Sequence, residues 1–307
     1  MFDVIIIGGG PAALSAAVYA ARQKISFMVV TENIGGQTAI SADIENYLGF
    51  PSTNGPELSG FFEKHINKYK VDAKEGEKAV DIQKNTTGFT VKTTAGSYET
   101  QAVLIASGKK PRKLGVPGED KLYGKGVTYC ATCDAPMFAS KDVAIIGGGN
   151  SAMDAALLAE KYSGRVYIIN INPDLMGDAT MMESIKKSKK ITVFNSSQTM
   201  EILGDKAVTG VKLKQGGSEN TVNVQGVFVE IGYIPSVDFD KLTEKNKWNE
   251  IVLHQENFMT NLTSVPGIFA AGDVTDVPEK QIIVAAGEGV KAILSTFKYL
   301  GSKTQGY

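Results

Sequence analysis

The sequence predicts an α/β protein made of two Rossmann-like, three-layer dinucleotide-binding domains, one inserted in the other. Two segments of the same design predict it: FDVIIIGGGPAALSAAVYAAR at 2–22 and KDVAIIGGGNSAMDAALLAEK at 141–161. In each, a run rich in Val and Ile is typical of a buried parallel strand. A glycine cluster follows at once, and an Ala-rich stretch with helical spacing comes next. Because the second segment starts near the middle of the chain, we expect one domain to interrupt the other.

The expected boundaries follow the composition. We predict a first part of one domain at 1–114, an inserted domain at 115–240 and a second part at 241–307. Segments rich in Gly and Pro, at 111–127 and 231–240, are the expected crossings and hinges. Strand meanders are expected at 79–106 and 200–231.

The bulk composition excludes several classes of protein. The chain has 307 residues, of which 43% are hydrophobic and 21% charged, as in an ordinary soluble protein of about two domains. Its formal charge of −1 gives no basic field for nucleic acid or an anionic membrane. No apolar run approaches the roughly 20 residues that span a bilayer. No signal peptide is visible, so we expect a cytoplasmic protein.

The glycine clusters have the spacing of a dinucleotide fingerprint. Its first position permits a tight turn, its second lets the backbone approach a pyrophosphate, and its third lets helix pack on strand. These positions are Gly8, Gly10 and Ala13 in the first segment, and Gly147, Gly149 and Ala152 in the second. Two such units imply two nucleotide sites, usually for a flavin and a nicotinamide. The alternative is a pair of glycine turns that bind nothing.

Both cysteines lie in TYCATCDAPMF at 128–138, as a Cys-x-x-Cys pair. Half a zinc site, a structural disulfide and a redox-active dithiol are the three possible uses. Zinc needs more ligands, and the two histidines, His65 and His254, are distant in sequence. We therefore expect no metal site. A disulfide across two residues closes too short a loop to stabilise much. A redox dithiol is the leading interpretation.

At this point the sequence resembles a known family, over essentially its whole length. It is similar to the low-molecular-weight thioredoxin reductases and to the flavoprotein subunit of alkyl hydroperoxide reductase. The motifs that carry the resemblance, in order along the chain, are GGGPAA, GGQ at 35–37, IENYLGF at 44–50, IASGKKPR at 105–112, VPGED at 116–120, GVTYCATCDAPMF at 126–138, GGGNSA at 147–152, GIFAAGDV at 267–274 and KQIIVAAGEG at 280–289.

The resemblance implies FAD as a cofactor. The residues it places around FAD are Gly8, Gly10, Pro11, Ala12, Ala13, Glu32, Gly35, Gly36, Gln37, Asn46, Ala106, Gly108, Gly272, Asp273, Lys280, Gln281 and Ile282. Among them, Glu32 would bind the ribose hydroxyls or be a solvated turn residue. Asn46 would approach the isoalloxazine ring. Asp273 would accept a hydrogen bond from the ribityl chain, unless it only forms a turn.

The resemblance also assigns roles within the dithiol. Cys133 would be the thiol next to the flavin, and Cys130 would attack the substrate disulfide. Asp134 would act as general acid–base, or as a helix N-cap, or as both. Because one dithiol cannot meet the flavin and a protein substrate at once, we expect one domain to rotate against the other. Neither histidine is given a catalytic role.

The electron donor is where the sequence departs from the family pattern. The resemblance places Gly147, Gly149, Asn150, Ser151 and Asn170 around a nicotinamide nucleotide. An NADPH site would carry an arginine cluster after the second strand, and an NADH site would carry an acid at the strand tip. Neither signature occurs in residues 165–178, RVYIININPDLMGD. Asn170 stands where either signature would begin, and Asp174 comes a few residues later. Reduced ferredoxin and NADH are therefore favoured over NADPH, and the glycine motif persists either for a nucleotide or for packing.

The sequence thus predicts a thioredoxin-disulfide reductase, which passes electrons through FAD and Cys130–Cys133 to a thioredoxin or glutaredoxin-like protein. The alternatives are an NADH-dependent reductase that feeds a peroxide-reducing partner, a flavin oxidase, and a redox-sensing module. An oxidase would not need the dithiol. The peroxide-reducing relatives carry a further dithiol domain ahead of the FAD strand; its absence here favours a separate thioredoxin. The resemblance also implies a homodimer.

Overall fold

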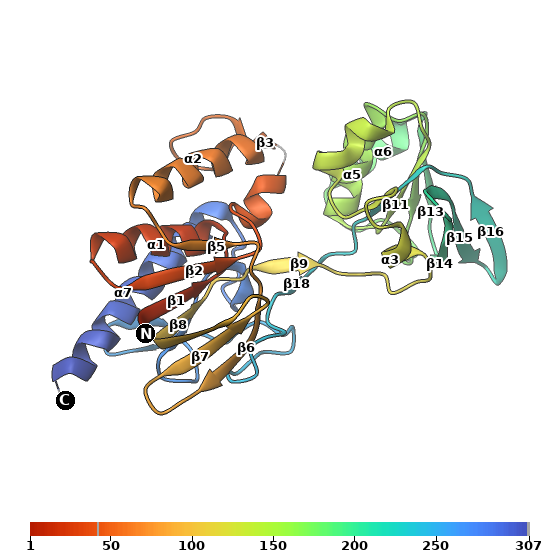
Figure 1. Ribbon diagram of the computed structural model, residues 1–307. Helices are drawn as coiled ribbons and strands as arrows, with labels where there is room; N and C mark the ends of the chain where they lie inside the picture. The colour runs from red at the N-terminus through yellow and green to blue at the C-terminus, as the bar shows by residue number, and fades with distance from the viewer. Residues whose placement is uncertain (42, 306–307) are drawn as a thin grey trace. The chain divides into compact units, whose positions relative to one another are not determined.

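The computed structural model describes residues 1–41 and 43–305, which divide into two compact units. Unit 1 comprises 1–110 and 234–307, and unit 2 comprises 111–233. The interruption of one unit by the other was expected, and the sequence had placed the boundaries after residues 114 and 240. Both units are α/β, which confirms the predicted fold class (Figure 1).

Unit 1 is built on a nine-stranded mixed sheet of order β19-β20-β21-β8-β1-β2-β5, with β7 pairing β8 and β6 pairing β7. The strands are β1 (Phe2–Ile7), β2 (Phe27–Thr31), β5 (Ala73–Glu75), β6 (Ala79–Lys84), β7 (Phe89–Thr93), β8 (Ser97–Ile105), β19 (His254–Glu256), β20 (Met259–Leu262) and β21 (Ile268–Ala270). Strands β21, β8, β1, β2 and β5 run parallel. Strands β3 (Asp43–Ile44) and β4 (Thr53–Asn54) form a separate short pair.

Helices cover one face of this sheet and a meander covers the other (Figure 1). The helices of unit 1 are α1 (Pro11–Arg22), α2 (Gly55–Lys68) and α7 (Ile282–Gln305), with 3₁₀ turns η1 (Gly36–Ile40) and η3 (Gly272–Val274). Alternate residues of β1 explain the three layers. Val4 and Ile6 face the alanines of α1, whereas Ile5 and Ile7 face Ile82 of the predicted meander.

Unit 2 has a five-stranded parallel sheet of order β10-β17-β11-β12-β13. These strands are β10 (Val127–Thr128), β11 (Val143–Ile146), β12 (Val166–Ile169), β13 (Ile191–Phe194) and β17 (Gly226–Val229). The helices are α3 (Glu119–Leu122), α4 (Ala131–Asp134), α5 (Asn150–Glu160) and α6 (Ala179–Lys187), with the 3₁₀ turn η2 (Ala135–Phe138). An antiparallel sheet of β14 (Ser197–Gly204), β15 (Val208–Gln215) and β16 (Ser218–Val222) is the second predicted meander.

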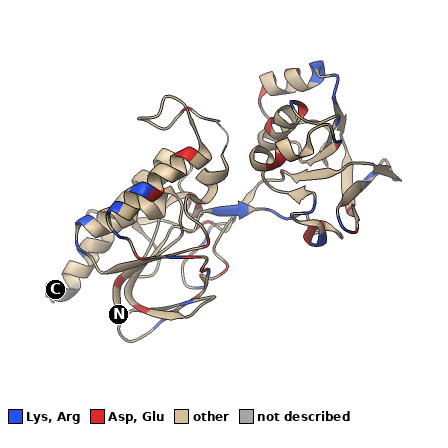
Figure 2. Cartoon of the chain, turned by 45° about the horizontal axis from the view of Figure 1, so that its top comes forward, with Lys and Arg blue, Asp and Glu red and all other residues tan. Residues whose placement is uncertain are grey.

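The chain crosses between the units twice, and the two crossing strands pair with each other. They are β9 (Lys109–Pro111) and β18 (Tyr233–Pro235). The first crossing is strongly basic, and Figure 2 shows it as a blue segment. Within the described part of the chain, no helix has the length and apolar character needed to cross a membrane.

Candidate functional site

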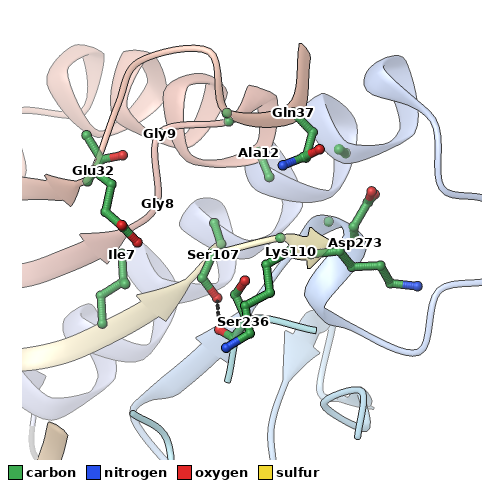
Figure 3. Close-up of a pocket in the computed structure, with 18 of the residues that line it drawn as sticks. Ile7, Gly8, Gly9, Ala12, Glu32, Gln37, Ser107, Lys110, Ser236 and Asp273 are labelled. Atoms are coloured by element: carbon green, nitrogen blue, oxygen red, sulfur yellow. Dashed lines mark hydrogen bonds between the residues drawn. The ribbon is translucent and has the colours of Figure 1, made fainter. Parts of the chain in front are cut away.

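A cavity of about 750 Å³ opens in unit 1 at the carboxyl ends of β1, β2 and β8. In an open parallel sheet this is the edge where ligands bind. The predicted cofactor residues that line it are Gly8, Gly10, Pro11, Ala12, Glu32, Gly36, Gln37, Ala106, Gly108, Gly272, Asp273, Lys280, Gln281 and Ile282. Three segments far apart in the sequence therefore meet at one cavity (Figure 3).

Three predicted residues lie outside this lining. Ala13 is fully buried in the core between the sheet and α1, which is the packing role expected of it. Gly35 is buried behind the lining, where an added Cβ would meet Ser59 at 2.5 Å. Asn46 is exposed, and its amide donates a 3.0 Å hydrogen bond to Gln281 Oε1, a residue of the cavity wall.

The turn between β1 and α1 is a cradle that tolerates no side chain at two positions. Gly8 has φ +129°, and a Cβ there would meet Ala106 O at 2.2 Å. At Gly9 it would meet Asn33 O at 2.0 Å. At Gly10, which lines the cavity, it would meet no atom of the described residues within 4 Å. The backbone of Gly10 is thus open to close approach by a ligand, as a pyrophosphate requires.

A charged cluster stands at the end of the cavity formed by β9 and the segment before α7. Glu250 Oε1 lies 3.1 Å from Lys109 Nζ and 3.2 Å from Lys280 Nζ. Its other oxygen accepts a 2.9 Å hydrogen bond from Asn246. Burial raises the pKa of the nearby Asp273, and the charges of the two lysines act in the opposite direction. Asp273 is labelled in Figure 3.

The sequence analysis missed several residues of this wall. They include Gly9, Thr31, Asn33, Thr38, Ser107, Lys109, Lys110, Ser236, Asp238 and Phe239. Thr31, Asn33 and Ser107 are neighbours of predicted residues, so a wider reading of each motif would have found them. Ser236 carries no signal in sequence; the fold brings its carbonyl to the Ser107 hydroxyl at 2.7 Å (Figure 3). Thr38 Oγ1 is buried and has no hydrogen-bond partner in the part of the chain that the structure describes, so a cavity ligand could satisfy this polar group.

Unit 2 holds the two cysteines as a disulfide between Cys130 and Cys133, with their Cα atoms 5.4 Å apart. Cys130 caps the short helix α4, and its Sγ accepts a 3.1 Å hydrogen bond from the Cys133 N–H. Cys133 is exposed, whereas Cys130 is half-buried. No cluster of three metal-ligating side chains occurs among residues 1–41 and 43–305. A disulfide at an accessible turn can undergo exchange with another thiol.

The predicted acid–base residue lies beside the pair. Asp134 Oδ2 accepts a 2.5 Å hydrogen bond from Thr128 Oγ1, and that hydroxyl accepts a 3.1 Å bond from the Cys130 N–H. The N-cap of α4 is Cys130 rather than Asp134, because the carboxylate is the last residue of the helix. Asp134 is instead the N-cap residue of the 3₁₀ turn η2 that follows, where its side chain makes no capping hydrogen bond.

A second carboxylate, which the sequence analysis missed, borders the dithiol helix. Glu230 follows β17, and its carboxylate interacts with the backbone N–H of Ala131. Burial, together with the charge of Asp154, raises the pKa of Glu230 to about 7, and the Ala131 N–H opposes that shift. Glu230 also supplies the carbonyl that excludes a Cβ at Gly147. The dithiol helix and the second glycine turn thus share one neighbour.

The second glycine turn has the predicted backbone, with Gly147 at φ +140° and Gly149, Asn150 and Ser151 exposed at the start of α5. The side-chain oxygen of Asn150 is used inside the protein, because Oδ1 accepts a 2.8 Å hydrogen bond from the Asp178 N–H. The Met176 N–H donates to Gly148 O at 2.8 Å. The loop after β12 is therefore fastened to this turn at two points.

Asn170 corrects one expectation of the sequence analysis. Its side chain is only 1% exposed and packs under Gly148, where a Cβ would meet Asn170 Oδ1 at 2.2 Å. Its amide donates to Asp174 O and Asn195 Oδ1, each at 2.9 Å, and its oxygen accepts from the Asn172 N–H at 3.1 Å. Because both amide hydrogens are used inside the protein, Asn170 is a structural residue here and does not present a ribose ligand.

Comparison with known proteins identifies the family. The sequence pattern of the pyridine nucleotide-disulphide oxidoreductases matches residues 2–289. The chain belongs to this family. It is 39% identical over 303 residues to the F subunit of alkyl hydroperoxide reductase from Staphylococcus aureus, and 38% identical to that from Staphylococcus epidermidis. The match covers 97% of this chain but 59% of each relative's length.

Solved structures of thioredoxin reductases have the same fold as this chain. Thioredoxin reductase of Lactococcus lactis is 31% identical, with a TM-score of 0.85, over 98% of this chain and 100% of that one. Thioredoxin reductase of T. acidophilum is 40% identical, with a TM-score of 0.82, over 97% and 98% of the two chains. The resemblance stated from the sequence motifs is confirmed.

The cavity of unit 1 fits the flavin nucleotide that the family implies. The turn at Gly8, Gly9 and Gly10 has the shape that a pyrophosphate needs, with open space at Gly10, and the Thr38 hydroxyl, which finds no hydrogen-bond partner among the described residues, lies in the same lining. Lysines at one end suit a ligand that carries negative charge.

The loop 171–178 of unit 2 carries no Lys or Arg, so it offers no cation for the 2′-phosphate of NADPH.

Proposed function

We propose that this protein is an FAD-dependent disulfide reductase, which passes electrons through FAD and Cys130–Cys133 to a disulfide of a thioredoxin or glutaredoxin-like protein. The observation that carries the proposal is the Cys130–Cys133 disulfide in the same chain as a cavity suited to FAD. A flavin and a dithiol each exchange two electrons, so the two groups match in stoichiometry. The likeness to thioredoxin reductases over nearly the whole chain supports the same substrate class.

In the proposed mechanism, FAD, when bound, supplies the electron pair that reduces the disulfide. The cavity residues would bind and orient it, and Gly10 would hold the pyrophosphate while Asp273 would accept a hydrogen bond from the ribityl chain. Cys133, the more exposed residue of the pair, is the one we assign to the flavin side. Cys130 is the sulfur we assign to the substrate. Because cavity and dithiol belong to different units, we place the movement that joins them at β9 and β18.

The exchange with substrate balances as a thiol–disulfide reaction. The Cys130 thiolate attacks one substrate sulfur, a mixed disulfide forms, and the other substrate sulfur leaves as a thiolate. Cys133 then attacks Cys130, which restores the Cys130–Cys133 disulfide and releases the second substrate sulfur. Two electrons and two protons reach the substrate. Asp134, held by Thr128 beside Cys130, is positioned to take the thiol proton and return it to a leaving thiolate.

For the electron donor, we propose reduced ferredoxin or NADH rather than NADPH. The loop 171–178 has no basic residue for a 2′-phosphate, which counts against NADPH. Asn170 is used in internal hydrogen bonds and offers no ribose ligand, which favours ferredoxin over NADH. The second glycine turn keeps its shape for packing as well, because Gly147 touches Glu230 O and Ala152. These contacts support a turn that persists even without a nucleotide.

The first experiment is an anaerobic titration of the FAD-loaded protein. Flavin absorbance is followed while NADH, NADPH or enzymatically reduced ferredoxin is added, and the effective donor then drives reduction of a thioredoxin. Bleaching by NADPH at least as fast as by either other donor would contradict the donor assignment. The Cys130→Ser variant should lose thioredoxin reduction and keep reduction of ferricyanide, which needs only the flavin. Retained thioredoxin reduction would overturn the mechanism.

A second candidate function rests on the 39% identity to the F subunit of alkyl hydroperoxide reductase. In that case the reduced dithiol would serve a peroxide-reducing partner, with NADH as donor. Supplying the protein with a peroxiredoxin and a hydroperoxide, with and without thioredoxin, separates the two. Peroxide consumption that needs no thioredoxin would favour the second function.

We also propose a homodimer, which light scattering after gel filtration would test.

A further inference from the structure

We propose that Glu250 is a positioning residue, which holds Lys109 and Lys280 as a positively charged wall of the FAD cavity and thereby sets the reduction potential of the flavin. This inference rests on the proposed use of the cavity for FAD. It goes beyond that function because it concerns the energy at which the flavin accepts electrons. None of the dinucleotide or dithiol motifs in the sequence contains Glu250.

The three side chains form one ion-paired cluster. A single oxygen, Glu250 Oε1, lies 3.1 Å from Lys109 Nζ and 3.2 Å from Lys280 Nζ. The side chains are 20%, 13% and 23% exposed for Lys109, Glu250 and Lys280. Charges this sheltered are screened less by salt than surface pairs are, so they act on their surroundings.

Each member is also fixed by further contacts. The Glu250 carboxylate accepts a 2.9 Å hydrogen bond from the Asn246 side-chain amide. The backbone N–H of Glu250 donates a 3.0 Å hydrogen bond to Asn246 Oδ1. Lys280 Nζ reaches Thr275 O at 2.5 Å. Burial acts to raise the pKa of Glu250, but its hydrogen bonds to Asn246, Lys109 and Lys280 together outweigh burial and lower the pKa. The carboxylate therefore stays charged, and the trio carries a net charge of +1.

This charge belongs to the cavity wall rather than to the outer surface. Lys109 and Lys280 both line the cavity, and so does Asp273. Burial raises the pKa of Asp273, and the charges of both lysines oppose that rise. Lys280 precedes Gln281 and Ile282, the residues that the family resemblance places at the flavin edge.

The chemistry of flavin explains why such a charge matters. Uptake of two electrons and one proton from an external reductant leaves the ring with a negative charge that the oxidised ring lacks. A positive wall stabilises that charge and favours the reduced form, so charge near the ring nitrogens tunes the potential. Lys109 and Lys280 would raise the potential, and Glu250 would limit the rise while it keeps both ammonium groups in place.

The test is the midpoint potential of the flavin, measured anaerobically against a reference dye in full-length FAD-loaded protein. Both cysteines are replaced by serine in every sample, so that the flavin titrates alone. Lys109→Met and Lys280→Met should each lower the potential. Glu250→Gln, which removes a negative charge, should raise it. A tenfold change in the two-electron equilibrium constant corresponds to about 30 mV, and a change of roughly this size is expected.

Lys74→Met is the matched control, since it removes the same charge from an exposed pair with Asp72 outside the cavity lining. It should leave the potential unchanged. A shift in Lys74→Met equal to that in Lys109→Met, or unchanged potentials in both Lys109→Met and Lys280→Met, would overturn the proposal. So would a fall in Glu250→Gln. Failure of the proposed function is seen separately, because a protein that does not retain FAD gives no flavin spectrum.

Discussion

The hydroxyl of Thr128 donates a 2.5 Å hydrogen bond to the carboxylate of Asp134. The same hydroxyl accepts the Cys130 N–H at 3.1 Å, so one side chain links the carboxylate to the dithiol. This arrangement fixes Asp134 on the side of Cys130 and restricts its rotation. A proton acceptor with a fixed place is what thiol activation needs.

Asp134→Asn should therefore slow thiol–disulfide exchange by about 10²- to 10⁴-fold, the usual range for loss of a general acid–base. The measurement is single-turnover reaction of the pre-reduced dithiol with oxidised thioredoxin. Thr128→Val keeps the Asp134 carboxylate but removes the hydrogen bond that holds it. We therefore expect a smaller fall in the exchange rate for Thr128→Val than for Asp134→Asn. Equal exchange rates in Asp134→Asn and the unmodified protein would show that another group moves the proton.

The pKa of Glu230, raised to about 7 by burial and by Asp154, predicts a pH-dependent stability. Between pH 4.5 and 7 the folded protein binds more protons at this group than the unfolded chain does. Stability through Glu230 therefore falls as pH rises across this window. The shift from 4.5 to about 7 corresponds to at most about 3 kcal/mol. Glu230→Gln should remove this part of the decline.

Urea unfolding at pH 5 and pH 8 measures that difference. The control is Glu219→Gln, because the pKa of the exposed Glu219 is lowered by its hydrogen bond to Lys212, the opposite direction. In Glu219→Gln, the free energy of unfolding should still decline as pH rises from 5 to 8. If Glu230→Gln and the unmodified protein lose the same stability between pH 5 and pH 8, the raised pKa of Glu230 is wrong.

The buried amide of Asn170 predicts a structural effect. Asn170→Ala removes two donated hydrogen bonds and one accepted bond from a site that is 1% exposed. We expect the free energy of unfolding to fall by about 2–3 kcal/mol, with faster proteolysis in the loop 171–178. Asn172→Ala, at an exposed side chain, should change it by less than about 0.5 kcal/mol. Equal effects of the two substitutions on unfolding would contradict this account.

The sequence predicted what depends on local pattern. Both strand–glycine–helix units, both strand meanders and the presence of a dithiol turn follow from periodicity and spacing, which neighbouring residues determine. The cavity itself lies beside the predicted Gly8 turn, at the edge where the parallel strands of the sheet end. The placement of Gly272 and Asp273 at that edge came from the family resemblance, since no local rule joins residue 272 to residue 8.

Contacts between distant segments could not be predicted from the sequence. Lys109 and Glu250 are 141 positions apart, and neither stands in a motif that points to the other. The direction of the Asn170 side chain was also beyond reach, because an Asn at a strand end can face solvent or fold inward. Its choice depends on Asn195 and Asp174, which only the folded loop brings near.

Gly9 and Gly10 are adjacent, yet their substitution by Ala should have different consequences. At Gly9 an added Cβ would lie 2.0 Å from Asn33 O and 2.3 Å from Thr31 Oγ1, so the end of β2 must move. At Gly10 it would meet nothing within 4 Å, and φ is −82°, which any residue adopts. The space beyond Gly10 is the cavity itself.

We therefore expect Gly10→Ala to keep the stability of the FAD-free protein and to weaken FAD binding at least tenfold, because the methyl group occupies the place of the pyrophosphate. Gly9→Ala should lower the melting temperature of the FAD-free protein as well. Fluorescence titration with FAD and thermal unfolding without it measure the two effects independently. Full FAD affinity in Gly10→Ala would mean that the pyrophosphate does not lie against this turn, and the assignment of the cavity to FAD would have to be abandoned.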